Sequence, residues 1–196
     1  EAGAITPEKM LEQATIAIDQ ARIQNRRFVV YDAKETIDPG LQLTLASDVH
    51  KGLAAGQFSV VYQAQVEIRE GRVVGAEALL RWHHPVHGDI SPDLFIPTAE
   101  ETGAIDALTR WTLRQAIADQ AQLQAAGIDI PISINASGRS ISDPEFFPHV
   151  IEVVRQSSAR ICVEVTETAI IADPVAAIAS IAALKAAGIG VSVDDY

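Results

Sequence analysis

The chain has little of several features on which proteins commonly rely. Cys162 is its only cysteine, which excludes an intramolecular disulfide and a cysteine zinc cage. Lysine and arginine number 15 against 26 aspartates and glutamates, a formal net charge of −11 at pH 7. A surface of this sign repels nucleic acid polymers. A single thiol, with no basic region and apolar stretch over residues 1–10, leads us to expect a cytoplasmic protein.

Long hydrophobic runs are also scarce. Residues 174–193 approach the length of a membrane span with one charge, Lys185, but most of this stretch is alanine. Asp173 and Pro174 are typical of a helix start and Gly188 of a helix end, so we expect an ordinary helix, a short strand after it, and no membrane segment. With 48% hydrophobic and 21% charged residues, the composition is that of a folded domain.

The residue pattern divides the chain near residue 36. Before this point the sequence predicts a helix opened by Thr6 and Pro7 and a short strand at 28–31. A second helix is expected after the Asp38-Pro39-Gly40 break, ending near residue 55. We therefore expect a boundary that separates residues 1–36 from a second domain at 37–196.

From residue 58 onward, apolar runs alternate with helical patterns. We expect strands at 58–68, 73–82, 130–135, 161–166 and 189–194, and helices at 99–126, 143–156 and 173–187. The tight Glu70-Gly71-Arg72 turn makes the first two strands antiparallel neighbours, whereas the later alternation favours a parallel sheet or barrel.

Alternation within these strands predicts where a site lies. One face carries branched apolar residues for packing against helices, and the other carries small residues and then an oxygen-bearing side chain near the strand's carboxyl end. These side chains belong to Glu77, Asn135, Glu164 and Asp194. A (β/α) barrel places its site at this end of the strands. We therefore expect an α/β fold with these four residues close together.

Four converging oxygen ligands, followed by a further acid at Asp195, indicate a site for a hard cation such as magnesium or manganese. The alternative is that each acid pairs separately with a base, which avoids a costly unpaired cluster. Arg81 lies on the same face as Glu77 and is either a phosphate clamp or a counter-ion of the carboxylates.

Three histidines, His83, His84 and His87, invite a zinc hypothesis, but no other ligand lies nearby in the sequence. We expect them to form hydrogen bonds at the rim of the barrel instead. Trp82 and Trp111 are expected to pack in the core, as is Cys162.

The stretch Glu77-Ala78-Leu79-Leu80-Arg81-Trp82 resembles the signature of the EAL domain, the bacterial cyclic di-GMP phosphodiesterase family. Further blocks agree in order: Phe95-Ile96-Pro97, Ala99-Glu100-Glu101, Ile134-Asn135-Ala136-Ser137, Glu164-Val165-Thr166-Glu167 and Val193-Asp194-Asp195-Tyr196. The segment up to about Lys34 resembles the closing helix and strand of a GGDEF domain, without that domain's signature loop.

The resemblance implies a (β/α)8 barrel of the triosephosphate isomerase type with an antiparallel first strand, of which this chain holds the N-terminal part. It also implies metal-dependent hydrolysis of cyclic di-GMP to linear pGpG in second-messenger signalling, with two magnesium or manganese ions. The implied metal ligands are Glu77, Asn135, Glu164, Asp194 and, for a second ion, Asp195. Substrate contacts match Gln63, Leu79 and Arg81, and Glu167 matches an acid that steadies a mobile catalytic loop.

Two positions differ from the usual family pattern: Ala64 stands where proline commonly follows the glutamine, and Tyr196 stands where phenylalanine is commoner. The barrel pattern also stops after its fifth major strand, whereas a complete barrel has about 250 residues. The alternative to an enzyme is a cyclic di-GMP receptor or a scaffold that does not cleave it. Homodimers are common in the family and are expected here as a possible assembly.

Overall fold

The structure is a computed structural model that describes residues 6–23, 27–31 and 39–194. The chain divides into two compact units, residues 1–42 and 43–196, and each is considered by itself. Asp195 and Tyr196 lie outside the described residues.

In the first unit, the predicted helix forms as α1 (Pro7–Ile23), with the Thr6 carbonyl accepting a hydrogen bond at its start. The strand expected at 28–31 is wrong, because these residues have no strand conformation. Phe28 and Val30 are each 77% exposed. A strand forms when its side chains pack and its backbone pairs, and β-propensity alone supplies neither.

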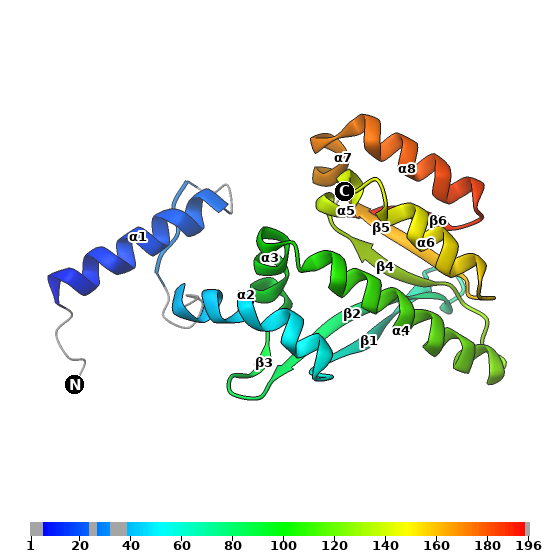
Figure 1. The fold of residues 1–196 in the computed structure, drawn as a ribbon, viewed down its shortest axis with the longest axis horizontal. Coiled ribbons are helices and arrows are strands. Elements are labelled where there is room, and N and C mark those ends of the chain that lie inside the picture. The colour runs from blue at the N-terminus through cyan, green and yellow to red at the C-terminus, as the bar shows by residue number, and fades with distance from the viewer. Residues whose placement is uncertain (1–5, 24–26, 32–38, 195–196) are drawn as a thin grey trace. The chain divides into compact units, whose positions relative to one another are not determined.

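The second unit is built on one mixed sheet (Figure 1). Its strands are β1 (Phe58–Glu67), β2 (Arg72–His84), β3 (Gly88–Ile90), β4 (Ile132–Ala136), β5 (Ile161–Thr166) and β6 (Gly190–Asp194). They lie in the order β1-β2-β4-β5-β6, with β3 paired to β2. β1 and β2 are antiparallel, and the β2-β4, β4-β5 and β5-β6 pairs are parallel. This is the predicted α/β arrangement of an incomplete barrel with an antiparallel first strand.

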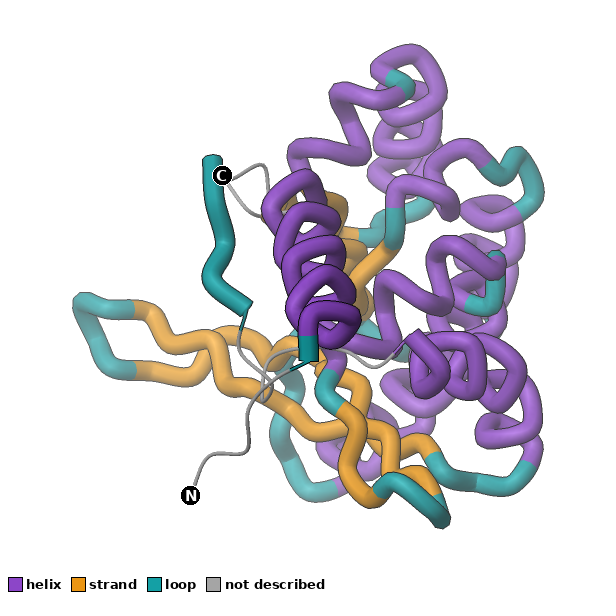
Figure 2. Tube along the Cα trace, turned by 90° about the vertical axis from the view of Figure 1, so that its left-hand side faces the viewer, coloured by secondary structure: helices purple, strands orange, loops and turns teal. Residues whose placement is uncertain are grey.

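The helix α2 (Pro39–Ala54) precedes the sheet, and the other helices follow the strands as the alternation predicts. They are α3 (Pro92–Thr102), α4 (Ile105–Ala125), α5 (Gly138–Ser142), α6 (Phe146–Arg155), α7 (Glu167–Ala172) and α8 (Pro174–Ala186). Figure 2 shows helices gathered on one side of the sheet. The single helix expected at 99–126 is two helices, because Gly103 takes a left-handed φ of 79° and ends α3. The short β3, α5 and α7 were not predicted.

The Asp-Pro pairs at 143–144 and 173–174, where the sequence predicts two helix starts, behave differently. Asp173 caps α8 as predicted, its carboxylate accepting the Ala176 N–H at 3.0 Å. Asp143 instead accepts the N–H of Glu145 at 2.9 Å, in a turn that precedes α6 at Phe146. The helix expected from residue 143 therefore begins later.

The apolar face of the strands packs against the helices. Ile132, Ile134 and Val163 are fully buried, in one cluster with Leu113 and Leu184 of the covering helices. Aromatic residues pack around the end of β2, where the ring of Phe58 stacks on that of Trp82 with 4.9 Å between the ring centroids. Since these residues occupy the helix-facing side, the opposite side of the strands is left for a site.

Gln120 is a fully buried polar residue that joins α4 to the strands it covers. Its amide nitrogen donates to the carbonyls of Ile130 and Arg160 at 2.7 and 3.2 Å, next to the starts of β4 and β5. Its amide oxygen accepts the N–H of Arg160. Buried backbone groups that lose their partners cost free energy, so this side chain matters for stability.

We expect Gln120→Ala to lower the free energy of unfolding by about 3 kcal/mol, because the Ile130 carbonyl and the Arg160 N–H lose their side-chain partner and a fully buried side chain is removed from the core. Gln122→Ala, on the exposed side of the same helix, is the control and is expected to cost under about 0.5 kcal/mol. Urea denaturation measures both. Equal losses would show that Gln120 contributes no more than a surface glutamine.

Within the described part of the chain, no helix combines the length and the apolar character that crossing a membrane requires.

Candidate metal and substrate site

The strand register brings the four predicted oxygen residues to one face of the sheet, called here the inner face. Asn135 of β4 is directly opposite Glu164 of β5. Glu77 of β2 pairs with Ser133, two residues before Asn135, and Asp194 of β6 pairs with Thr166, two residues after Glu164. Side chains two residues apart share a face. The predicted convergence is therefore present in the structure.

Three of these side chains form a compact carboxylate cluster. Ligand oxygens of Glu77, Glu164 and Asp194 all lie within 4.8 Å of one another. The amide nitrogen of Asn135 donates to Glu77 Oε1 at 2.8 Å. An amide has both a donor and an acceptor, so Asn135 holds Glu77 while its own oxygen remains available as a ligand.

Charge and burial test whether these residues fit a cation. Glu164 is only 7% exposed. Among the residues that the structure describes, no lysine, arginine or histidine forms an ion pair with Glu77, Glu164 or Asp194. Three close carboxylates without a base repel one another, and a divalent cation removes that repulsion. The alternative of separate acid–base pairs does not describe this cluster, and an all-oxygen donor set fits magnesium or manganese.

The residues expected to contact substrate lie beside the cluster. Gln63 of β1 is directly opposite Glu77, and Leu79 and Arg81 continue along the same face of β2. Arg81 is exposed, and its Nη1 donates to the Leu80 carbonyl at 2.7 Å. Within the described residues it has no carboxylate partner, so its guanidinium is not a counter-ion of the cluster and its other donors remain available for an anion.

Two further predicted residues follow the strand ends. Glu167 is exposed and is the first residue of α7, directly after β5. Thr166 precedes it as the helix cap, its hydroxyl accepting the Ala169 N–H at 3.3 Å. This cap fixes the start of α7, and with it the position of Glu167 directly after the end of β5. Asp195 lies outside the described residues.

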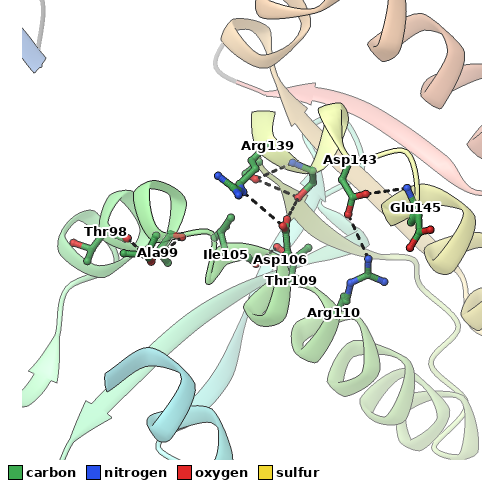
Figure 3. A network of polar contacts seen from close by, with 12 residues as sticks. Thr98, Ala99, Ile105, Asp106, Thr109, Arg110, Arg139, Asp143 and Glu145 are labelled. Carbon is green, nitrogen blue, oxygen red and sulfur yellow. Dashed lines mark hydrogen bonds and ion pairs between the residues drawn. The ribbon is translucent and has the colours of Figure 1, made fainter. Parts of the chain in front are cut away.

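A network of polar contacts holds the segment that follows Asn135 (Figure 3). Asp106, in the first turn of α4, accepts the Ser140 hydroxyl at 3.2 Å and lies 3.8 Å from Arg139 Nε. One turn later, Arg110 pairs with Asp143 at 3.6 Å. These contacts bind both ends of α5 to α4, so the chain is restrained immediately beyond β4.

The histidine side chains of the loop after β2 take part in hydrogen bonds and ion pairs. His84 is buried, its Nδ1 accepting the N–H groups of Val86 and His87, while its Nε2 lies 3.5 Å from Asp48. Because both ring nitrogens have partners, His84 acts by stabilising the turn that follows β2. His83 pairs with Asp89 at 2.7 Å. The expected hydrogen bonds are therefore present for these two residues.

Gln65 is a site residue that the sequence did not reveal. Its side-chain nitrogen donates to Glu164 Oε1 at 3.2 Å, although the two residues belong to β1 and β5. Gln65 is two residues after Gln63 and so shares the inner face. The alternation of residues along β1 was the signal in the sequence that could have placed Gln65 at the site.

Comparison with known proteins agrees with this geometry. The model of the EAL domain family matches residues 46–196. A cyclic di-GMP phosphodiesterase of Pseudomonas aeruginosa is 34% identical over 142 residues, covering 71% of this chain and 24% of that protein. The bifunctional diguanylate cyclase/cyclic di-GMP phosphodiesterase MucR of the same species is 30% identical, covering 97% of this chain and 29% of that protein.

Among solved structures, the c-di-GMP complex of PaMucR phosphodiesterase has a TM-score of 0.72 and 34% sequence identity, covering 78% of this chain and 64% of that one. A carboxylate cluster on the inner face of an incomplete barrel thus occurs in a chain that a family model matches over most of its length. The chain belongs to the EAL-domain family. It spans less than a third of the two curated relatives above.

Proposed function

We propose that this chain supplies the metal-binding strands of an enzyme that hydrolyses one phosphodiester bond of cyclic di-GMP to give linear pGpG. The observation that carries the proposal is the cluster of Glu77, Glu164 and Asp194, which lies beside Asn135 and has no cationic partner within the described residues. Membership of the EAL family and the named phosphodiesterase relatives support it.

The cation would be held by Glu77, Asn135, Glu164 and Asp194, and Asp195 would contribute to a second one. Bound magnesium or manganese supplies Lewis acidity toward phosphate oxygens and makes water a stronger nucleophile. The chain itself orients the substrate. Arg81 presents a fork of N–H donors to a phosphate, a paired contact that a point charge does not provide.

Gln63 lies opposite Glu77 and offers an amide that matches the hydrogen-bonding edge of guanine, with Leu79 supplying apolar contact on the same face. Glu167, at the start of α7, steadies a catalytic loop. We also propose that residues 1–36 are the end of a GGDEF-like domain and its linker, since the bifunctional MucR relative matches 97% of the chain. On this proposal the protein acts in the cytoplasm, where a single unpaired cysteine is stable.

The proposal is tested by incubating cyclic di-GMP with the full-length protein and magnesium. The nucleotides present are then followed by chromatography. Appearance of linear pGpG in stoichiometric excess over enzyme is the expected result. If cyclic di-GMP binds and is recovered intact, the protein is a receptor, and if it does not bind, the protein is a scaffold. Either outcome contradicts the proposal.

Arg81→Ala should weaken cyclic di-GMP binding by about 10- to 100-fold, because a charge-assisted hydrogen bond contributes about 1.5–3 kcal/mol. The melting temperature should stay unchanged, since Arg81 is exposed. Calorimetric titration measures the affinity. Arg69→Ala, at an exposed position near the β1–β2 turn, is the matched control. Equal affinities of the two variants would remove Arg81 from the substrate site.

A further inference from the structure

Glu164, the most buried acid of the cluster, is hydrogen-bonded to a residue of a strand that is not next to its own strand in the sheet. Glu164 accepts a hydrogen bond from Gln65 Nε2 at 3.2 Å, and among the described residues this is the contact its side chain makes. Gln65 belongs to β1, whereas Glu164 belongs to β5, with β2 and β4 between them in the sheet. A glutamine reaching across two strands requires a clear path.

Gly75 provides that path. It is directly opposite Gln65 on β2, and a Cβ at this position would lie 2.6 Å from Gln65 Oε1. Any other residue would therefore displace the glutamine side chain. The register of β1 and β2 also shifts between Gln65 and Val66, where Val74 of β2 has no partner. The missing side chain at Gly75 leaves room for the Gln65 amide along the inner face.

We propose that Gln65 is a positioning residue for the metal centre, with Gly75 as the residue that admits it. The inference rests on the proposed function, because it assigns Glu164 to a cation. Gln65 occupies Oε1 of Glu164 with an N–H donor, which fixes the rotation of the carboxylate and directs its remaining lone pairs to the ligand position. Partners of this kind set ligand orientation and basicity in metal sites.

A positioning role and a merely structural role predict different effects when the hydrogen bond between Gln65 and Glu164 is lost. If the hydrogen bond only joined β1 to β5, its loss would lower the stability of the metal-free protein and leave metal affinity alone. If it orients a ligand, its loss weakens metal binding in the folded protein. Removal of such a partner commonly costs about 10- to 100-fold in metal affinity.

The test uses the full-length protein and Mn²⁺ as the probe, with binding measured by calorimetry and by the electron paramagnetic resonance of free Mn²⁺. Gln65→Met keeps the side-chain length and removes the donor, and we expect about 10-fold weaker Mn²⁺ binding. Gly75→Ala retains the donor but displaces it, and should produce a similar loss. The double variant should be no weaker than Gln65→Met alone, because both changes remove the same contact.

The outcomes separate this inference from the proposed function. If the parent protein produces pGpG and Gln65→Met binds Mn²⁺ as tightly as the parent, only the positioning role is wrong. Additive losses in the double variant would also overturn it, since Gly75 would then act independently. If the parent binds no Mn²⁺, the metal centre itself is absent and the proposed function fails. Should Gln65→Met not fold, Gly75→Ala with its intact glutamine decides the question.

Discussion

Replacing Glu77 by alanine is expected to reduce cyclic di-GMP hydrolysis at least about a thousand-fold. Glu77 is one of three carboxylates whose ligand atoms lie within 4.8 Å of one another, and Asn135 is hydrogen-bonded to it. The substitution therefore removes one ligand and releases a second. Charge stabilisation by a bound cation contributes several kcal/mol to such reactions, and each 1.36 kcal/mol is a factor of ten in rate.

The fold should survive this substitution, because Glu77 lies on the inner face and the helix-facing core is formed by its neighbours Ala76 and Ala78. Magnesium should raise the melting temperature of the parent protein but not of the variant, since only a bound ligand stabilises the native state. Glu152→Ala, an exposed carboxylate on α6, is the matched control. Parental turnover by Glu77→Ala would show that this acid holds no catalytic metal.

Exhaustive removal of divalent cations is expected to abolish hydrolysis entirely. The cluster carries three carboxylates, and in the described part of the chain it has no positively charged partner to replace the ion. Magnesium or manganese should restore turnover. Calcium should restore far less, because it prefers bonds of about 2.3–2.6 Å and a larger ligand number than the compact octahedral shell of magnesium.

This dependence is measured by following turnover with chromatography. The assay is run after chelation and again after each cation is added back. The control is the melting temperature of the metal-free protein, which shows that the fold is retained during chelation. Full activity in the chelated protein would contradict the two-cation proposal. Equal activity in calcium and magnesium would show that the geometry of the ligand shell does not limit the reaction.

The sequence predicted the strands that carry the site more accurately than the elements around them. Alternation placed Asn135 and Glu164 on one face, and the parallel register confirms this. Such predictions succeed because a one-residue shift would move the apolar residues out of the core. The antiparallel first pair was also predictable, since the Gly71 turn has a φ of 67° that glycine readily adopts.

Other features depend on contacts between distant residues. Phe28 and Val30 suit a strand by type, but they lie exposed and outside any sheet in the structure. Asp143 and Asp173 precede proline alike, yet only Asp173 caps the start of a helix, whereas Asp143 lies at the C-terminal cap of α5. The role of Gln65 depends on a glycine across the hairpin and on an acid three strands away, a combination that local periodicity does not reveal.

The most direct test of the metal centre is an anomalous diffraction map from a crystal of the full-length protein grown with Mn²⁺. We expect a peak between Glu77, Asn135, Glu164 and Asp194, at about the 2.0–2.2 Å separation that carboxylate oxygens keep from such ions. A map with no peak there, or with its only peak beside His83 and His87, would contradict the assignment of these strand-end residues as metal ligands.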